Sequence, residues 1–458
     1  MRYTQNDNVY ESTAQYATDW SSINWYKVEK YIDKLQKRIY HAESIGDSRK
    51  VRDLQRILVR SESAILMAVK RVTQINKGKR TPGIDGKVIK TDKQRGELVD
   101  KLKTRNISKH VPKPAYRHYI RKKNGKLRPL GIPTIIDRVY QEIIRMALEP
   151  QMEVNFEPIS YGFRPKRGVH DAVERIFNII HNNKFCEVFE GDFKDCFNNL
   201  SHEFILSKIR GFPLIKLVER YLKAGYVDNG VFNRTTSGTP QGGLLSPLLA
   251  NIALTGLEDY LNISYKKRTQ IRNGETKEFY ETKGKYRVTR YADDFVIFAS
   301  TREELLQLVP KMDSYLREQL HQRLHPKKIH IQPVAKGFQW IGTIIHTNRV
   351  YISNRTRGRM YSRIYEYNRL AEAGRALDYV ENFAQSMNSY LGMMVHYNSY
   401  NIRKKVMYLI HPEWWKYVQF DGHCRKFIVK KKFRQRSILR NQLRSGGYKS
   451  ILTPELES

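Results

Sequence analysis

The sequence has 458 residues, enough for two to four structural units and a sizeable core. Lysine and arginine number 82 against 46 aspartate and glutamate residues, and the resulting formal net charge of +36 favours a polyanionic partner. No run approaches the roughly 20 apolar residues that a membrane-spanning helix needs, so a nucleic acid explains the charge better than a membrane does.

The cysteines and the N-terminal residues indicate the cellular compartment of the protein. Cys186, Cys196 and Cys424 are far apart and form no C-x-x-C pair, so neither a zinc module nor a disulfide framework is supported. Free cysteines suit a reducing compartment. The first twenty residues contain no apolar run of the kind that marks a signal peptide. We therefore expect a cytoplasmic protein.

Apolar residues recur at helical spacing from Trp25 onward, after a lead over residues 1–20 that we expect to be disordered. Spacings of three and four predict amphipathic helices in a helical extension over residues 1–80. Their basic residues fit either a solvated face or contact with a phosphate backbone. The apolar positions are Val28, Ile32, Leu35 and Ile39, then Val51, Leu54, Ile57 and Leu58, then Ile65, Leu66, Val69 and Val72.

A turn and a hairpin follow the helical extension. Residues 81–86 read Thr-Pro-Gly-Ile-Asp-Gly, dense turn chemistry that marks a boundary. Residues 119–130 predict a hairpin with its turn at Asn124 and Gly125 and with cations on both arms. Lysines on an exposed hairpin can simply block edge pairing. Their density here also fits a flap that grips a triphosphate.

The middle of the chain predicts a strand, a loop and a helix. Residues 187–193 resemble a buried strand that ends in an acid, Asp192. The loop at 238–243 reads Gly-Thr-Pro-Gln-Gly-Gly, and Ser246 with Pro247 predicts a helix start in which Ser246 is the N-cap. Residues 262–286 are polar and charged, which indicates a surface insertion. The core-facing positions of the helix are Leu248, Leu249, Ile252 and Leu257.

An acidic pair lies between two apolar, β-branched segments. Residues 291–294 read Tyr-Ala-Asp-Asp and predict two strands joined by a tight turn that carries Asp293 and Asp294. Two adjacent carboxylates repel each other unless a cation neutralises them, and carboxylate oxygens suit Mg²⁺. The plainer interpretation is that Asp-Asp is good turn chemistry.

The last third of the chain is basic. A further strand pair is expected at 338–342 and 350–352, and the pattern beyond residue 355 turns helical. From Arg425 to Arg444 the chain contains no acidic residue.

Two of these features together fit one reaction. Adding a nucleotide to a strand is an in-line phosphoryl transfer, which needs carboxylates from two backbone segments around a pair of ions. Asp192 from one strand, with Asp293 and Asp294 from a neighbouring hairpin, would supply them.

The order of the motifs resembles that of the reverse transcriptases, specifically those of group II introns, over about residues 25–408. The order is 81–86, then Arg-Pro-Leu-Gly-Ile-Pro-Thr at 128–134, Tyr-Gly-Phe-Arg-Pro at 161–165, the segment 192–197, Thr-Pro-Gln-Gly at 239–242, the Tyr-Ala-Asp-Asp box and Trp-Ile-Gly at 340–342. A lone Y-x-D-D is weak, whereas seven motifs in order are specific.

The resemblance implies roles for the residues around the acids. Asp192, Asp293 and Asp294 would be the catalytic, metal-binding triad for two Mg²⁺ ions, which Mn²⁺ could replace, and the carbonyl of Phe193 would be a further ligand. Phe197 would crowd a ribose 2′-hydroxyl and so select deoxynucleotides. The alternative for Phe197 is an ordinary core aromatic.

The resemblance also implies substrate contacts. Lys122 and Arg128 would hold the incoming dNTP, with directional bonds from the guanidinium. Gln241 would lie beside the nascent base pair, and Gly242 would let the backbone approach it. Lys328 would lie near the leaving pyrophosphate, as a charge contact or a general acid. Trp340 and Gly342 would hold the primer end.

Three departures from the family pattern bear on function. The usual Ile-Pro-Lys of the finger hairpin is Ile-Arg-Lys at 120–122, and the Gly-Trp…Tyr element of the thumb appears as Gly392-Met393…His396-Tyr397. The second change weakens the case for recognition of an intron RNA. After residue 416 no paired cysteines and histidines occur, so an HNH endonuclease domain is not expected.

We therefore expect an α/β (α+β) right-hand polymerase. The expected parts are a helical extension at 1–80, fingers and a ferredoxin-like palm at 81–345, a helical thumb or maturase-like domain at 346–415, and a basic tail at 416–458. The expected activity is RNA-directed DNA synthesis in a bacterial cytoplasm, from an RNA template, a DNA or RNA primer and dNTPs. A maturase that binds a structured intron RNA is a second hypothesis, and a domesticated enzyme in defence, repair or a CRISPR-associated system is a third.

Overall fold

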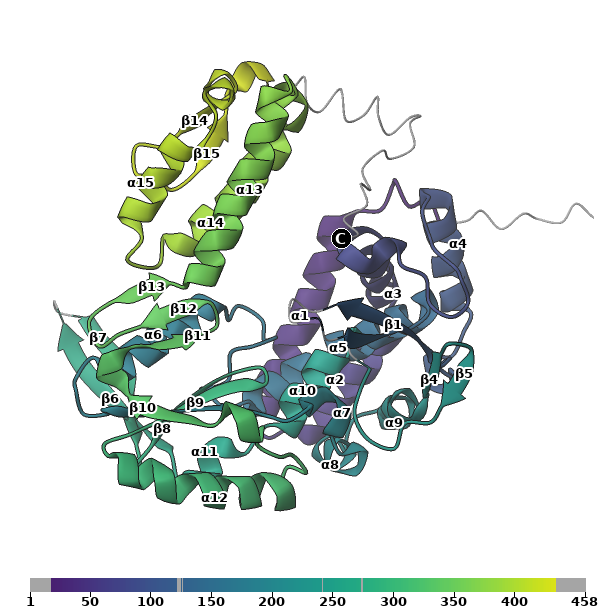
Figure 1. Cartoon of the computed structure of the whole chain (residues 1–458). Helices are drawn as coiled ribbons and strands as arrows, with labels where there is room; N and C mark the ends of the chain where they lie inside the picture. The colour runs from purple at the N-terminus through teal and green to yellow at the C-terminus, as the bar shows by residue number, and fades with distance from the viewer. Residues whose placement is uncertain (1–17, 122–124, 126, 241, 273–274, 434–458) are drawn as a thin grey trace, which may run out of the picture. The chain divides into compact units, whose positions relative to one another are not determined.

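The structure is a computed structural model that describes residues 18–121, 125, 127–240, 242–272 and 275–433 (Figure 1). Contacts within these residues divide the chain into two compact units. The first comprises residues 18–167, 190–297 and 306–330, and the second comprises 168–189, 298–305 and 331–433.

Three capped helices open the first unit: α1 (Trp25–Ser44), α2 (Ser48–Arg60) and α3 (Glu62–Lys70). Side chains of Asn24, Asp47 and Ser61 accept backbone N–H bonds at the three N-termini. The predicted apolar stripes are buried, with one exception. Ile57 is 48% exposed, because the buried face of α2 consists of residues 51, 54, 55, 58 and 59. Val59 therefore takes the core position that was expected for Ile57.

The expected hairpin is present in the first unit. Strands β1 and β2 are antiparallel, with Ile120 opposite Arg128, in a sheet of order β2-β1-β4-β5. The predicted turn residue Asn124 lies outside the described residues. The elements of this region are η1 (Arg71–Ile75), η2 (Lys77–Arg80), α4 (Asp92–Lys103), η3 (Ile107–Lys109), β1 (Ala115–Arg121), β2 (Leu127–Ile132), α5 (Ile135–Asn155), β4 (Tyr226–Asp228) and β5 (Val231–Asn233).

Short helices follow, and one predicted cap is wrong by a residue. Ser246 is the first residue of α10 rather than its N-cap, which is Leu245. The Ser246 hydroxyl instead bonds Pro240 O and the Thr239 hydroxyl, both at 2.8 Å, and so ties the helix to the preceding loop. Leu257 is buried as expected but begins a separate helix. These helices are α7 (Cys196–Asn199), α8 (His202–Lys208), α9 (Ile215–Lys223), α10 (Ser246–Ala253) and α11 (Leu257–Tyr260).

A four-stranded sheet of order β10-β3-β9-β8 carries the predicted acids. The expected strand before Asp192 is β3, and the two strands around Asp293 are β8 and β9, which confirms both predictions. Val188, Phe189, Val296 and Ile297 are fully buried in it. The elements are β3 (Glu187–Asp192), β8 (Arg287–Tyr291), β9 (Asp294–Ala299), α12 (Arg302–Glu318), η4 (Pro326–Lys328) and β10 (His330–Pro333).

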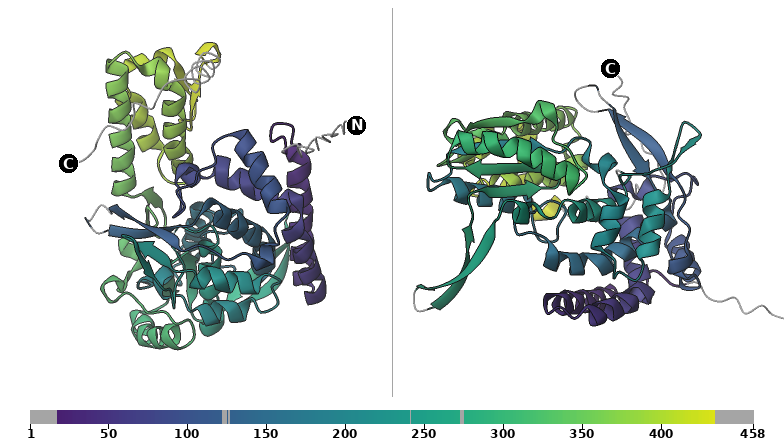
Figure 2. Two further views of the ribbon diagram at one scale, coloured as in Figure 1. Left: turned by 90° about the vertical axis from the view of Figure 1, so that its right-hand side faces the viewer. Right: turned by 90° about the horizontal axis from the view of Figure 1, so that it is seen from below.

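The expected polar insertion at 262–286 is a long antiparallel hairpin. Its strands are β6 (Ser264–Arg272) and β7 (Glu275–Lys283), paired from Ser264 with Lys283 to Arg272 with Glu275. Figure 2 shows it as a ribbon that extends away from the rest of its unit.

The second unit contains α6 (Val169–Ile180), η5 (Val334–Lys336) and a small sheet that corrects one prediction. The expected pairing of 338–342 with 350–352 is wrong, because the intervening segment is itself a strand. The sheet has the order β11 (Phe338–Trp340), β12 (Thr343–Ile345), β13 (Val350–Ile352), with β12 in the middle.

A thumb-like helical core completes the second unit, with α13 and α14 side by side (Figure 1). The Trp414 ring stacks on Phe383 at 4.2 Å between centroids, and Phe427 packs beside them. Residues 418–429, expected in a basic tail, therefore belong to this core. The elements are α13 (Asn354–Glu372), η6 (Ala376–Tyr379), α14 (Val380–Met394), α15 (Tyr400–Leu409), η7 (Pro412–Lys416), β14 (Val418–Phe420) and β15 (Phe427–Val429).

The described part of the chain contains no helix with the length and apolar character needed to cross a bilayer.

Candidate active site

Asp192 is held at the end of a buried strand. The segment after α12 fastens the chain there, because His325 N donates to Asp192 O at 2.8 Å and Lys194 N donates to Arg323 O at 2.9 Å. Phe193 forms an antiparallel bridge with Leu324. These bonds fix the backbone on both sides of the carboxylate.

The same segment brings a cation to Asp192. Lys328 is the last residue of η4, and its ammonium forms an ion pair with Asp192 Oδ2. The Asp192 side chain is only 12% exposed, whereas that of Lys328 is 56% exposed. The sequence motifs that carry these residues are 136 positions apart, and the fold places them in direct contact.

Asp293 and Asp294 lie at the turn from β8 to β9. Ala292 takes a left-handed φ of 57°, which lets the chain reverse within two residues. The carbonyl of Ile159 accepts from Arg290 N, and Tyr161 N donates to Arg290 O, both at 2.9 Å. The predicted turn is therefore clamped from one side by the Tyr-Gly-Phe-Arg-Pro segment.

A buried arginine stabilises the turn through hydrogen bonds. The Arg290 side chain is 0% exposed and donates from Nη1 to Asn251 Oδ1 and Ala292 O, both at 3.1 Å. Burial lowers the pKa of Arg290, and the nearby Glu157 carboxylate opposes that shift. Sequence reasoning missed Arg290, because one more arginine in so basic a chain carries no distinguishing signal.

One aromatic ring places the two strand ends next to each other. A Cβ on Gly191 would lie 2.3 Å from Cζ of Phe295, so only glycine fits there. The Phe193 ring lies 5.1 Å from the Phe295 ring. Since Asp192 lies between Gly191 and Phe193, and Asp294 precedes Phe295, the two aspartates come from adjacent ends of neighbouring strands.

The electrostatics around Asp293 and Asp294 favour the binding of a cation. Desolvation by surrounding protein atoms, and next the Asp293 carboxylate, raises the pKa of Asp294 to about 6 although part of its surface is accessible. Burial, followed by Asp293, raises the pKa of the Cys196 thiol to about 12, which places Asp293 near the helix that follows β3. Like charges close together are relieved by a positive ion.

The carboxylates are suitable ligands for a hard divalent ion, but they do not form a complete coordination site within the residues that the structure describes. Among the described residues, no three His, Cys, Asp or Glu side chains lie close enough together to hold a metal. Asp192 instead pairs with Lys328. An all-oxygen donor set of this kind suits Mg²⁺ or Mn²⁺ rather than a softer metal.

Phe197 lies in α7, five residues after Asp192. It is partly exposed rather than a core residue. Thr239 N donates to Phe197 O at 2.8 Å, and a Cβ on Gly238 would lie 2.7 Å from the same carbonyl. Gly238 and Thr239 of the predicted loop are therefore packed against the Phe197 backbone.

The predicted dNTP contacts are described only in part. Arg128 is exposed on β2. Gly242 has a φ of 116° and would place a Cβ 3.0 Å from Gly131 O, so glycine permits the close approach of the loop to β2. Lys122 and Gln241 lie outside the described residues.

Trp340 and Gly342 belong to the second unit. The Trp340 side chain is 5% exposed, and Gly342 has a φ of 82° in the turn from β11 to β12. The Gly342 carbonyl accepts from Ser353 N at 3.0 Å. The indole is therefore buried, whereas Ile341 and Gly342 in the turn are partly exposed.

Comparisons with known proteins agree with this geometry. Residues 20–102 match the family model for the N-terminal domain of reverse transcriptase, and residues 120–345 match that for reverse transcriptase (RNA-dependent DNA polymerase). Protein YkfC of Escherichia coli (strain K12) is 34% identical over 335 residues, which cover 68% of this chain and 87% of that protein.

Further matches include an intron-encoded protein, a maturase-like protein and a solved telomerase. Group II intron-encoded protein LtrA of Lactococcus lactis subsp. cremoris is 31% identical over 328 residues, 60% of this chain and 53% of LtrA, so the chain spans about half the length of that relative. Maturase-like protein 1 of Euglena gracilis is 28% identical over 247 residues, 53% of each chain. A solved telomerase from Candida Tropicalis is 13% identical with a TM-score of 0.42, over 68% of this chain and 58% of that one.

The matched models cover the fingers and palm motifs in order, and the strand ends carry the acids that those motifs contribute. The chain belongs to the reverse transcriptase family, the RNA-directed DNA polymerases, and its relatives in that family include a group II intron-encoded protein.

Proposed function

We propose that Asp192, Asp293 and Asp294 form the catalytic centre for DNA synthesis on an RNA template. The observation that carries this proposal is the packing of Gly191 and Phe193 on Phe295, which brings the two acidic strand ends together. Two divalent ions held by these carboxylates and the Phe193 carbonyl would activate the primer 3′-hydroxyl and offset charge on the phosphates. Mg²⁺ is the proposed ion, and Mn²⁺ would substitute.

The chain's own residues would orient the nucleotide. Phe197, with its partly exposed ring beside the clamped 238–239 loop, would exclude a ribose 2′-hydroxyl. Arg128, with Lys122, would bind the triphosphate, and Gln241 would lie beside the new base pair. The Lys328 ammonium, already beside Asp192, would donate a hydrogen bond to an oxygen of the leaving pyrophosphate.

The Asp293→Asn, Asp294→Asn double variant tests the catalytic assignment. Losing these ligands should cost several kcal/mol of transition-state stabilisation, roughly a thousandfold or more in primer extension. RNA affinity should persist, because it depends on lysines and arginines spread over the surface. Extension near the parent rate would overturn the assignment, and circular dichroism with RNA affinity on the same preparation controls for folding.

A second function, splicing assistance, is supported by the exposed basic face of α13. Arg355 and Arg359 are exposed there, as is Arg363, which pairs with Glu366. A face of this kind fits a phosphate backbone. The proposal predicts that the Asp293→Asn, Asp294→Asn variant still promotes splicing of a bound intron RNA. Crosslinking in the native cell would identify that RNA, and a broad spread of transcripts instead of one structured intron would contradict the maturase role.

A further inference from the structure

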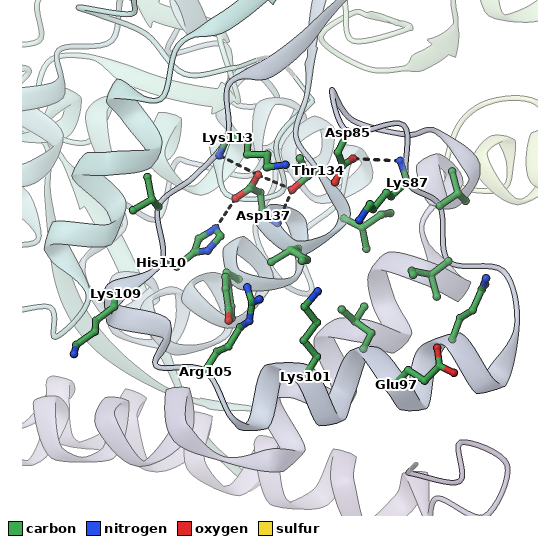
Figure 3. A pocket seen from close by; sticks show the side chains of 18 of the residues that line it. Asp85, Lys87, Glu97, Lys101, Arg105, Lys109, His110, Lys113, Thr134 and Asp137 are labelled. Atoms are coloured by element: carbon green, nitrogen blue, oxygen red, sulfur yellow. Dashed lines mark hydrogen bonds and ion pairs between the residues drawn. The ribbon is translucent and has the colours of Figure 1, made fainter. Parts of the chain in front are cut away.

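A cavity in the first unit is lined mainly by residues outside the family motifs, although Asp85 and Thr134 belong to the motifs at 81–86 and 128–134. It has a volume of about 880 Å³, within the roughly 300–1,000 Å³ typical of small-ligand pockets. Its walls come from residues 85–89, from α4, from the segment 105–113 and from the start of α5 (Figure 3). None of the proposed catalytic or dNTP-binding residues lines it.

Cations surround this cavity from several segments. Lys101 and Arg105 extend toward it from α4 and the turn after it, and Lys87 and Lys113 flank it, whereas Lys109 points away (Figure 3). All of them are exposed. Within the described part of the chain, none forms an ion pair with a carboxylate. Their charge is therefore available to an anion.

The three carboxylates at the cavity do not cancel that charge, because one buried arginine offsets part of the charge of two of them. Burial lowers the pKa of Arg138, and Asp85 and then Asp137 oppose the shift, so both acids lie within electrostatic reach of this guanidinium. Arg138 itself is held by the carbonyls of Pro133, Gly78 and Thr81. The third acid, Glu97, points away from the centre of the cavity (Figure 3).

The floor is a built hydrogen-bond network. The Asp137 side chain is 1% exposed, and its Oδ1 lies 2.6 Å from Nε2 of His110. Thr134 Oγ1 donates to Asp137 Oδ2 at 2.6 Å. The His110 ring meets the buried Tyr140 edge-on at 4.6 Å. His110 is thereby fixed in orientation, and its Nδ1 has no hydrogen-bond partner among the described residues.

Apolar side chains provide the remaining wall. Val88, Ile89, Leu98 and Ile135 also line the cavity. A flat apolar group can lie against such a wall while an attached anion meets the cations, and a phosphate alone would leave the wall unused.

We propose that this cavity binds one nucleotide unit, with its phosphate at Lys101 and Arg105 and its base against the apolar wall near His110. The same chemistry is offered by a free nucleotide and by a single nucleotide of an RNA strand. The site goes beyond the proposed polymerase centre and does not depend on it.

Fluorescent ATP titrated by anisotropy into the full chain tests the site. The Asp293→Asn, Asp294→Asn background with EDTA removes the catalytic site from the measurement. Saturable binding should persist there, and a further Lys101→Gln, Arg105→Gln change should weaken it about tenfold or more. Lys93→Gln, on the same helix but outside the cavity, should leave binding unchanged. Absence of saturable binding, or equal affinity in the Lys101→Gln, Arg105→Gln variant, would overturn the proposal.

Competition experiments distinguish a free nucleotide from a nucleotide of an RNA strand as the ligand. Displacement of the probe by ATP at lower concentration than by a short single-stranded RNA supports a free nucleotide, and the reverse order supports a nucleotide of an RNA strand. Inorganic tripolyphosphate should compete poorly in either case. If tripolyphosphate displaces the probe at concentrations as low as the stronger of the other two competitors, the base makes no contact with the cavity and the nucleotide assignment fails. Primer extension by the Lys101→Gln, Arg105→Gln variant in an otherwise native chain should match the parent, which separates this site from the polymerase centre.

Discussion

Gly162 lies directly against the backbone of Ala292, so closely that a Cβ at position 162 would fall 2.4 Å from Ala292 N. The Asn251 side chain holds the Gly162 carbonyl at 2.8 Å. The glycine of the Tyr-Gly-Phe-Arg-Pro motif therefore determines where the turn with Asp293 can lie. A chain of hydrogen bonds links the two, because Asn251 donates to Gly162 O and accepts from Arg290, which in turn donates to Ala292 O.

Gly162→Ala should consequently displace the acidic turn. We expect primer extension to fall by about tenfold or more, since misplacing catalytic groups by about 1 Å can cost a hundredfold. RNA affinity should change little. Gly211→Ala is the matched control, because a Cβ there would meet nothing closer than 4.0 Å. Parent-like extension by Gly162→Ala would show that the turn tolerates the shift.

Phe197→Ala should let the enzyme incorporate ribonucleotides while dNTP incorporation stays largely intact. The ring follows Asp192 by five residues and is partly exposed, so its removal opens space at the sugar without emptying a buried core. Single-nucleotide extension with matched dNTP and rNTP measures the ratio of kcat/KM values. Phe204→Ala, a similarly half-buried ring in α8, should leave that ratio unchanged. An unaltered ratio in Phe197→Ala would assign the ring to packing.

RNA binding should depend strongly on salt, because neutralising many phosphates releases counterions. With a formal net charge of +36, we expect affinity for a primer–template to fall by roughly a thousandfold or more between about 50 and 200 mM salt. Filter binding across a salt series measures the slope. A flat response would contradict the interpretation of the charge as a nucleic-acid footprint.

Sequence patterns predicted the strands that carry the acids because local signals agree there. Apolar, β-branched runs flank Asp192 and the Asp293 turn, and each run by itself indicates a strand. Helix α1 was equally clear, since its stripe has one period throughout. The start of α10 was predicted one residue too late, because a Ser-Pro step fits either a cap or a first turn, and the choice depends on Thr239 and Pro240.

What local patterns did not predict depends on distant partners. Thr343–Ile345 is too short to be recognised, and it becomes a strand because β11 and β13 flank it. The segment around Phe427 looks like a basic tail, yet the ring is buried against Phe383 and Trp415 in the thumb-like core. The pairing of Lys328 with Asp192 and the cavity around His110 likewise combine segments far apart in sequence.

Two truncations should separate the core of the thumb-like region from the basic segment after it. Removing residues 434–458, which lie outside the described chain, deletes five basic and two acidic residues. We expect weaker RNA binding with an unchanged Tm. Removing residues 425–458 also takes Phe427 and Val429 from the core, which should cost several kcal/mol, since deleting one large buried side chain costs about 2–5 kcal/mol.

Thermal unfolding and RNA titration of both truncated proteins distinguish the two contributions. Unchanged RNA affinity after loss of 434–458 would leave that segment without the proposed role. An unchanged Tm after loss of 425–458 would contradict the placement of β15 in the core.

Lys328→Met should have two effects, because the ammonium pairs with Asp192 and the side chain is 56% exposed, which leaves it accessible to a leaving pyrophosphate. Loss of a donor at the leaving pyrophosphate should lower kcat by about tenfold or more. Loss of a cation from Asp192 should also lower the Mg²⁺ concentration needed for half-maximal extension, because an added ion no longer competes with the ammonium. Lys336→Met, an exposed lysine without an ion pair among the described residues, is the control. Lys328→Arg should restore part of the rate, since it retains the charge. A lower rate with an unchanged Mg²⁺ dependence would assign Lys328 to the leaving group alone, and parent-like values for both would remove it from the catalytic centre.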